Sequence, residues 1–254
     1  MKQEQMLEIK VLGSVEIVAN GKVGRISAPK ARCVLALMAL HANQVVYIES
    51  IIEELWDQNP PKTAVTTVQT YMYHLRRLLA ECTDPTGSVS LETRQRGYAL
   101  VVRDGQIDAM EFLRLIDCAS SAFDSGKPAE AARQVHRAFG LWHGPALADV
   151  ATGPLLEAHL VHLREQRKRA LEIRIEADLE LGRHRALIPE LRYLIAQDSL
   201  NEWLHGRLIV ALERSGRRSE ALQVYQDVRQ VLHDEVGLEP SEGLRRIQHE
   251  VLTA

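Results

Sequence analysis

One segment, TTVQTYMYHLRRLL at positions 66–79, carries hydroxyl, imidazole and guanidinium groups where a solvated helix usually carries Glu and Lys. At about 100° per residue, its apolar residues share one sector and its polar residues share the opposite sector. Such polar groups donate or accept hydrogen bonds at base edges and phosphates, whereas a carboxylate repels a nucleic-acid backbone. The face therefore favours contact with DNA, although taken alone it also fits an ordinary solvated helix. The apolar sector is Val65, Val68, Met72, Leu75 and Leu79, and the polar sector is Thr63, Thr66, Thr70, Tyr73, His74, Arg77 and Glu81.

The first hundred residues contain the elements that would position this helix. Period-2 alternation in LEIKV predicts a strand, and VEIVANGKV predicts a hairpin that turns at Asn20-Gly21. Helical periodicity then begins, and a strand pair returns at the end of this half. The predicted order is strands at 7–11 and 15–23, helices at 27–42, 49–56 and 66–79, and a hairpin at 88–102.

The terminal hairpin has basic residues beside its predicted tip, Gln95-Arg96-Gly97. Arg94 and Arg96 would form a short basic finger suited to a phosphate ridge or a minor groove. A helix in the major groove, braced by two further helices and such a hairpin, is a recurrent DNA-binding arrangement. The order of the elements raises DNA binding above the solvated-helix alternative.

The second half has helical periodicity only. A repeat aligns SGKPAEAARQVHRAF at 125–139 with SGRRSEALQVYQDVR at 215–229, and a weaker copy places Gly182 34 residues before Gly216. Such a period, with a Gly turn, is typical of tetratricopeptide-like helical pairs, which stack to bury their apolar faces. The predicted helices are 108–124, 128–142, 154–182, 184–197, 201–215, 218–234 and 240–252.

The composition is that of a soluble globular protein of 254 residues with a formal net charge of -3. Residues 1–104 carry a net charge of +1, so a nucleic-acid surface must be a local patch. No apolar run is long enough to span a membrane, which predicts a cytoplasmic protein. Three thiols without CxxC spacing, Cys33, Cys82 and Cys118, are expected to be free and buried.

These features together resemble the SARP family, the antibiotic regulatory proteins of filamentous actinomycetes. The resemblance rests on APKARCVLALMAL (28–40), IIEELWDQNPP (51–61), TVQTYMYHLRRLL (67–79), RGYAL (96–100) and EALQVYQDVRQVLHDEVGLEPSEGLRRIQ (220–248). It implies an α+β fold: an OmpR-type winged helix-turn-helix domain at 1–104, like a two-component output domain. An all-α, tetratricopeptide-like bacterial transcriptional activation domain would follow at 105–254.

The resemblance also implies a function and the residues that perform it. The protein would activate a secondary-metabolite gene cluster by binding repeated promoter sites as a homodimer and recruiting RNA polymerase through its sigma or alpha subunits. Base edges would be read by Thr66, Thr70, Tyr73, His74 and Arg77. Phosphate and wing contacts would come from Thr67, Tyr71, Arg76, Arg94, Arg96, Gly97 and Tyr98. The loop with Asp57, Gln58, Asn59 and Lys62 would meet the polymerase.

The sequence contains no nucleotide-binding glycine loop and no nucleophile elbow, so we expect no enzyme and no cofactor. Helical spacing that could hold a metal occurs at His159 and His162 with Glu157 and Glu165. No third ligand is evident, so we expect no metal. Two other functions remain open. One is a helical-repeat adaptor whose winged helix docks protein; the other is a repressor or ligand-responsive regulator that uses the same DNA contacts.

Overall fold

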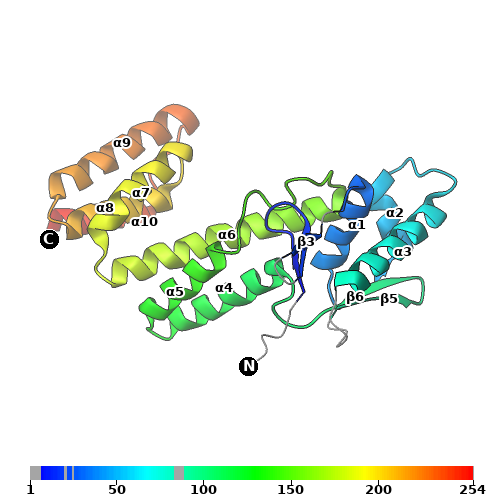
Figure 1. Ribbon diagram of the computed structural model, residues 1–254. Helices are drawn as coiled ribbons and strands as arrows, with labels where there is room; N and C mark the ends of the chain where they lie inside the picture. Colours follow the sequence, from blue (N-terminus) through cyan, green and yellow to red (C-terminus); the bar gives the residue numbers. More distant parts are fainter. Residues whose placement is uncertain (1–6, 20–21, 25, 83–88, 254) are drawn as a thin grey trace, which may run out of the picture. The chain divides into compact units, whose positions relative to one another are not determined.

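The computed structural model describes residues 7–19, 22–24, 26–82 and 89–253 (Figure 1). Within these residues the chain forms two compact units. The first contains the described residues up to Ala119 together with Arg133–Ala170, and the second contains Ser120–Ala132 and the described residues from Leu171 onward. The position after residue 104, where we placed the domain boundary, lies inside the first unit. The predicted Asn20-Gly21 turn lies outside the described residues.

The N-terminal sheet of the first unit has three antiparallel strands in the order β1-β2-β3. Its central pairing sets Ile9 of β1 opposite Ile17 of β2, and both side chains are fully buried. Charged neighbours point to the other face, as period-2 alternation requires. The strands are β1 (Glu8–Lys10), β2 (Glu16–Ala19) and β3 (Lys22–Gly24).

Three helices and a second sheet complete the winged helix. The first helix begins with Pro29, whose ring fits the first turn, and it is buried along most of its length. The second sheet is antiparallel in the order β4-β6-β5, and β4 is a two-residue strand that the sequence pattern did not predict. The elements are α1 (Pro29–Leu40), β4 (Val46–Tyr47), α2 (Ile48–Trp56), α3 (Ala64–Cys82), β5 (Ser90–Arg94) and β6 (Gly97–Val101).

Two carboxylates from beyond residue 104 bind groups of this N-terminal part. The side chain of Asp108, at the start of α4, accepts backbone N–H bonds from Val11 and Leu12 at 2.9–3.0 Å. Asp149 accepts the N–H of Val15 at 2.8 Å and pairs with Arg32 of α1 at 2.6 Å. The first unit therefore needs residues on both sides of position 104. Asp149 lies in the loop between α5 and α6, and the helices of this part of the chain are α4 (Asp108–Asp124), α5 (Pro128–Phe139) and α6 (Pro154–Glu180).

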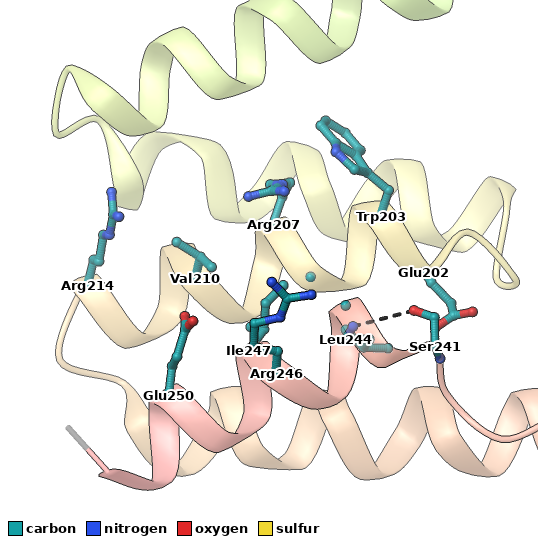
Figure 2. A pocket seen from close by; sticks show the side chains of 12 residues that line it. Glu202, Trp203, Arg207, Val210, Arg214, Ser241, Leu244, Arg246, Ile247 and Glu250 are labelled. Carbon is teal, nitrogen blue, oxygen red and sulfur yellow. Dashed lines mark hydrogen bonds between the residues drawn. The ribbon is translucent and has the colours of Figure 1, made fainter.

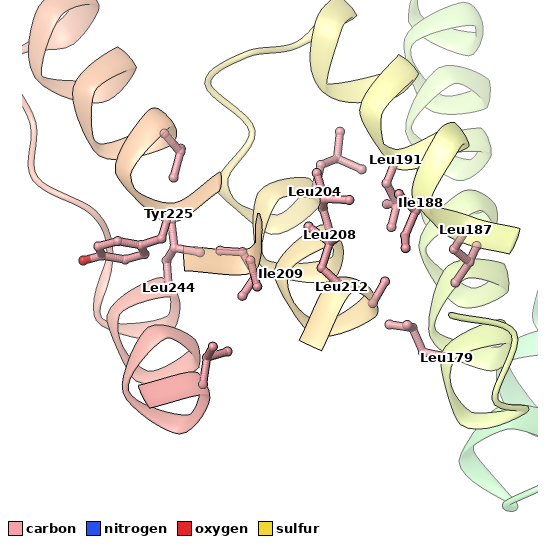
Figure 3. Close-up of a cluster of buried hydrophobic side chains, with 14 of the residues drawn as sticks. Leu179, Leu187, Ile188, Leu191, Leu204, Leu208, Ile209, Leu212, Tyr225 and Leu244 are labelled. Atoms are coloured by element: carbon pink, nitrogen blue, oxygen red, sulfur yellow. The ribbon is translucent and has the colours of Figure 1, made fainter. Parts of the chain in front are cut away.

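The second unit stacks helical pairs around an aliphatic core (Figure 3). Leu187 and Leu191 of α7 pack with Leu208 of α8, while Tyr225 of α9 belongs to the same core with Leu244 of α10. These helices are α7 (His184–Gln197), α8 (Glu202–Arg214), α9 (Arg218–Val236) and α10 (Glu242–Thr253). The predicted fold class, a winged helix followed by a tetratricopeptide-like helical domain, is confirmed.

The repeat predicted from glycine spacing has a backbone cause. Gly126, Gly182 and Gly216 all have left-handed φ angles of 69°, 75° and 77°, which side-chain-bearing residues rarely adopt. Each lies between two consecutive helices, so the same turn recurs along the chain.

The prediction that all three thiols are buried is wrong. Cys33 is buried in α1, but Cys82 is half-buried and Cys118 is exposed. Cys118 lies off the buried stripe of α4, which contains Phe112, Leu115 and Ile116 among its members. Apolar neighbours in the sequence therefore did not imply burial at that position.

Candidate nucleic-acid interface

The helix α3 has one buried face and one open face. Val68, Met72 and Leu75 are no more than 2% exposed, whereas Tyr73 on the opposite side is 62% exposed. Val65, which we assigned to the apolar sector, is 47% exposed, since it lies in the first turn of the helix. All five residues predicted to read bases are exposed within the first unit: Thr66, Thr70, Tyr73, His74 and Arg77.

Two threonine hydroxyls on α3 donate hydrogen bonds to backbone carbonyls four residues earlier in the chain. Thr70 donates to the carbonyl of Thr66 at 2.9 Å, and Thr67 donates to the carbonyl of Thr63 at 2.9 Å. Each hydroxyl oxygen keeps lone pairs, and each side chain keeps a methyl group, for an outside partner. The face can therefore accept hydrogen bonds from base amino groups and contact thymine methyls.

Arg77 is the exposed guanidinium on the open face of α3. It forms an i,i+4 ion pair with Glu81 at 2.9 Å, and the two side chains are 70% and 58% exposed. The hydrogen bond to Glu81 raises the pKa of Arg77, which is charged in any case. Because an exposed pair of this kind is weak, Glu81 orients Arg77 without preventing it from reaching another acceptor.

Arg76, predicted to contact phosphate, holds the wing instead. Its Nε donates to the carbonyl of Leu91 at 2.7 Å, and its Nη2 donates to the hydroxyl of Thr93 at 2.7 Å. The guanidinium also lies over the ring of Tyr98, 5.6 Å from its centroid. These contacts tie α3 to β5 and β6, so the main role of Arg76 in the structure is to fix the angle between helix and wing.

The wing hairpin turns at Gln95 and Arg96, and Arg96 has a φ of 62°. Arg94 and Arg96 are exposed, and Arg94 pairs with Glu92 at 2.5 Å. Gly97 and Tyr98, also predicted as wing contacts, are buried. A Cβ on Gly97 would lie 2.3 Å from the carbonyl oxygen of Val46, so β6 needs glycine there to pair with β4. Gly97 and Tyr98 support the wing rather than form its outer surface.

The loop between α2 and α3 is open along its length. Asp57, Gln58, Asn59 and Lys62 are all exposed, as a contact loop requires. Asp57 has a φ of 50° and donates its backbone N–H to the carbonyl of Glu53, so α2 ends in a fixed turn.

Comparison with known proteins decides the family. Residues 26–100 match the family model described as "Transcriptional regulatory protein, C terminal", and residues 107–252 match "Bacterial transcriptional activator domain". Over 253 residues the chain is 38% identical to Regulatory protein DnrI of Streptomyces peucetius, covering 98% of this chain and 93% of that protein. The chain is a SARP.

Other relatives of this SARP extend the comparison. It is 36% identical over 249 residues to Regulatory protein AfsR of Streptomyces coelicolor, of which it covers only 24%. It superposes on Mycobacterium tuberculosis EmbR, solved in complex with a low affinity phosphopeptide, with a TM-score of 0.90 and 30% identity. That match covers 98% of this chain and 66% of the other. These relatives confirm the predicted role as a DNA-binding transcriptional activator. Their names, all those of regulators, imply a non-enzymatic role.

The SARP contains one site residue that we did not predict. Glu54 of α2 is only 5% exposed, and its carboxylate accepts the backbone N–H groups of Gly153 at 2.6 Å, Leu155 at 2.8 Å and Leu156 at 3.3 Å. It thus caps the N-terminus of α6 from a helix about a hundred residues away, where the helix dipole also favours a negative charge. One feature of the sequence could have indicated that Glu54 is buried: it lies three residues after Ile51, on the apolar stripe of α2.

A second candidate surface of the SARP is a cavity of about 510 Å³ between α8 and α10 (Figure 2). Trp203 and Arg207 stand on α8, with the guanidinium 5.5 Å from the ring centroid, and Arg246 stands on α10. Glu202 and Glu250 line the same cavity, so its charges are mixed. Such a surface fits a protein partner better than a polyanion.

In the described part of the chain, no group of three His, Cys, Asp or Glu side chains is arranged to hold a metal ion. His159 instead meets His41, with 3.3 Å between their Nε2 atoms. Burial, followed by the neighbouring His41 and His162, lowers the pKa of His159. Among the described helices, none combines the length and apolar character that a membrane crossing requires.

Proposed function

We propose that this SARP activates transcription by inserting α3 into the major groove of promoter DNA, with the wing on the adjacent backbone. The observation that carries the proposal is the exposed polar face of α3, because its opposite face supplies the core of the winged helix. A helix anchored on one side and bare on the other has the geometry of a groove reader.

Base reading would be divided among the side chains according to their chemistry. Arg77 can donate two bonds to one guanine once it leaves Glu81, and His74 can donate to a guanine or accept from an amino group. Thr66 and Thr70 would offer methyl groups to thymine. Tyr73, whose ring meets His74 edge to face at 5.5 Å, would hold the imidazole in place.

Phosphate contacts would be few. Arg94 and Arg96 on the wing and Thr67 and Tyr71 on α3 would supply them, while Glu92 offsets part of the wing charge. At roughly 0.9 per neutralised phosphate, two to four contacts per copy correspond to a slope of about -2 to -4 for log affinity against log salt. A shallow slope of this size would indicate that specificity comes mainly from base edges.

Assembly as a homodimer and contact with RNA polymerase are further parts of the proposal. Two copies would bind repeated promoter sites in the cytoplasm, upstream of a secondary-metabolite gene cluster. The exposed loop with Asp57, Gln58, Asn59 and Lys62 would contact a sigma or alpha subunit of RNA polymerase. The charged and aromatic cavity between α8 and α10 is a second surface open to that machinery (Figure 2).

The test compares Arg77→Ala with Lys168→Ala in gel-shift titrations against the promoter fragment found by genome-wide footprinting. Lys168 is a matched control, because it is 71% exposed and pairs with Glu165 at 3.1 Å. Loss of a bidentate base contact costs about 1–3 kcal/mol, so we expect roughly 5- to 150-fold weaker specific binding for Arg77→Ala alone. Equal affinities of the two variants for the promoter would overturn the assignment of α3. Transcription reconstituted with purified polymerase distinguishes activation from repression.

A further inference from the structure

A cavity of about 440 Å³ lies in the first unit, between the first half of α6 and the loop that precedes it. Its size falls within the range of about 300–1,000 Å³ that is usual for small-molecule sites. Leu160 and Leu163 of α6 are 7% and 2% exposed, and they form an apolar wall with the loop residues Pro145 and Ala146.

Every polar side chain that lines this cavity is a hydrogen-bond donor. The indole Nε1 of Trp142 is buried and has no hydrogen-bond partner in the described part of the chain. Arg164 and Arg167 contribute two guanidiniums, and among the described residues no Asp or Glu lines the cavity. Arg167 lies over the indole, with its guanidinium carbon 4.6 Å from the ring centroid. Since tryptophan and arginine have no acceptor to offer, the complementary ligand must supply one.

We propose that this cavity binds a small molecule with an aromatic or alicyclic body and a carboxylate. The body would lie against Leu160 and Leu163, and the carboxylate would take the paired N–H groups of Arg164 or Arg167 in charge-assisted bonds.

The loop wall of the cavity is fixed before any ligand arrives. His143 donates its backbone N–H to the carbonyl of Leu12 at 2.9 Å, and Leu147 donates to the carbonyl of Val11 at 3.0 Å. Trp142 packs edge to face against the buried ring of Phe112, with the centroids 5.3 Å apart. A preformed site loses little conformational freedom on binding, which favours a small ligand.

A DNA phosphate is the other anion that two arginines could meet. Phosphate binding needs only exposed charge, whereas this site combines guanidiniums with an apolar wall and a half-buried indole. The walls therefore favour a small carboxylate over a nucleic-acid backbone.

The experiment titrates the full chain with 2-naphthoate and with the uncharged 2-naphthamide, using calorimetry and thermal denaturation. We expect naphthoate to bind at millimolar or lower concentration and to raise Tm, and naphthamide to bind about tenfold more weakly or not at all. The double substitution Arg164→Gln with Arg167→Gln should weaken naphthoate binding at least about tenfold. Lys168→Gln, an exposed neighbour on α6 outside the cavity lining, should leave it unchanged.

Three results would overturn the proposal. They are an absence of naphthoate binding to the folded chain, equal affinity for naphthoate and naphthamide, and undiminished affinity in the folded double variant. The double variant should also bind promoter DNA like the unaltered chain. If it loses DNA affinity and retains naphthoate affinity, the arginines are phosphate ligands and the proposed site is refuted. Arg164 and Arg167 are exposed, so we expect the double variant to fold. Circular dichroism checks that it does.

Discussion

Removal of the Glu54 carboxylate should weaken the first unit more than any exposed charge does. In Glu54→Ala, the backbone N–H groups of Gly153, Leu155 and Leu156 lose their acceptor at the start of α6. Hydrogen bonds to a charged group contribute roughly 1.5–3 kcal/mol each, and loss of a helix cap costs about 0.5–2 kcal/mol. The three bonds share one carboxylate and are not additive, so we expect a loss of about 3–5 kcal/mol in the free energy of unfolding.

A loss of that size is a large share of the about 5–15 kcal/mol that stabilises a typical domain. Glu54→Gln keeps one acceptor oxygen but turns an amide NH₂ toward N–H donors, so we expect an intermediate loss of about 1–3 kcal/mol. Gly153→Ala attacks the same contact from the other side, because the added Cβ would lie 2.4 Å from the backbone oxygen of Glu54.

The measurement is urea unfolding followed by circular dichroism, together with hydrogen exchange of peptides that cover residues 150–160. Glu53→Ala is the control, because Glu53 is the adjacent carboxylate in α2 and is exposed. We expect Glu53→Ala to stay within about 0.5 kcal/mol of the unaltered chain. The reasoning fails if Glu54→Ala and Glu53→Ala unfold at the same urea concentration, or if exchange near residue 155 stays slow.

Two further predictions concern titrating groups. Burial, with a smaller contribution from Glu54, raises the pKa of Cys33 to about 12. Iodoacetamide at pH 8 should therefore label the exposed Cys118 first, and Cys33 only after unfolding. Peptide mapping by mass spectrometry checks the order of labelling. Burial raises the pKa of Asp108 to about 6, so between about pH 4 and 6 the folded state holds this proton more tightly than the unfolded state. The contribution of Asp108 to stability should therefore fall as pH rises through that window, and an NMR titration of its carboxyl with a midpoint below 4 would contradict the assignment.

Local patterns were enough to predict the elements and the open face of α3. Period-2 alternation predicted β1 and β2, and 3.6-residue periodicity separated Met72 from Tyr73. The repeated glycine turns predicted the stacking of the second unit, because a left-handed residue between helices is a local requirement.

Contacts between distant segments were not predictable from such patterns. Arg76 shares the polar side of α3 with Arg77, yet it is held by Leu91 and Thr93 of a strand fifteen or more residues later. Tyr98 follows the exposed tip of the wing, yet it is only 8% exposed and pairs with Val46 of β4, and a two-residue strand leaves almost no trace in a sequence. Whether an arginine faces solvent or a neighbouring hairpin depends on register, which single-sequence periodicity does not give.

Buried and half-buried carboxylates connect segments on the two sides of residue 104, the position at which the type of secondary structure changes. Glu54 lies before residue 104 and its N–H partners lie after it, while Asp108 and Asp149 lie after it and hold backbone before it. A fragment that ends at residue 104 lacks the N–H donors of Glu54 and the carboxylates that accept from Val11 and Val15, so water would have to take their places. Because each lost hydrogen bond to a charged group costs about 1.5–3 kcal/mol, we expect residues 1–104 to be less stable alone than in the full chain. The winged helix and the first part of the segment that matches the activator-domain model therefore belong to one compact unit, although the two family models meet between them.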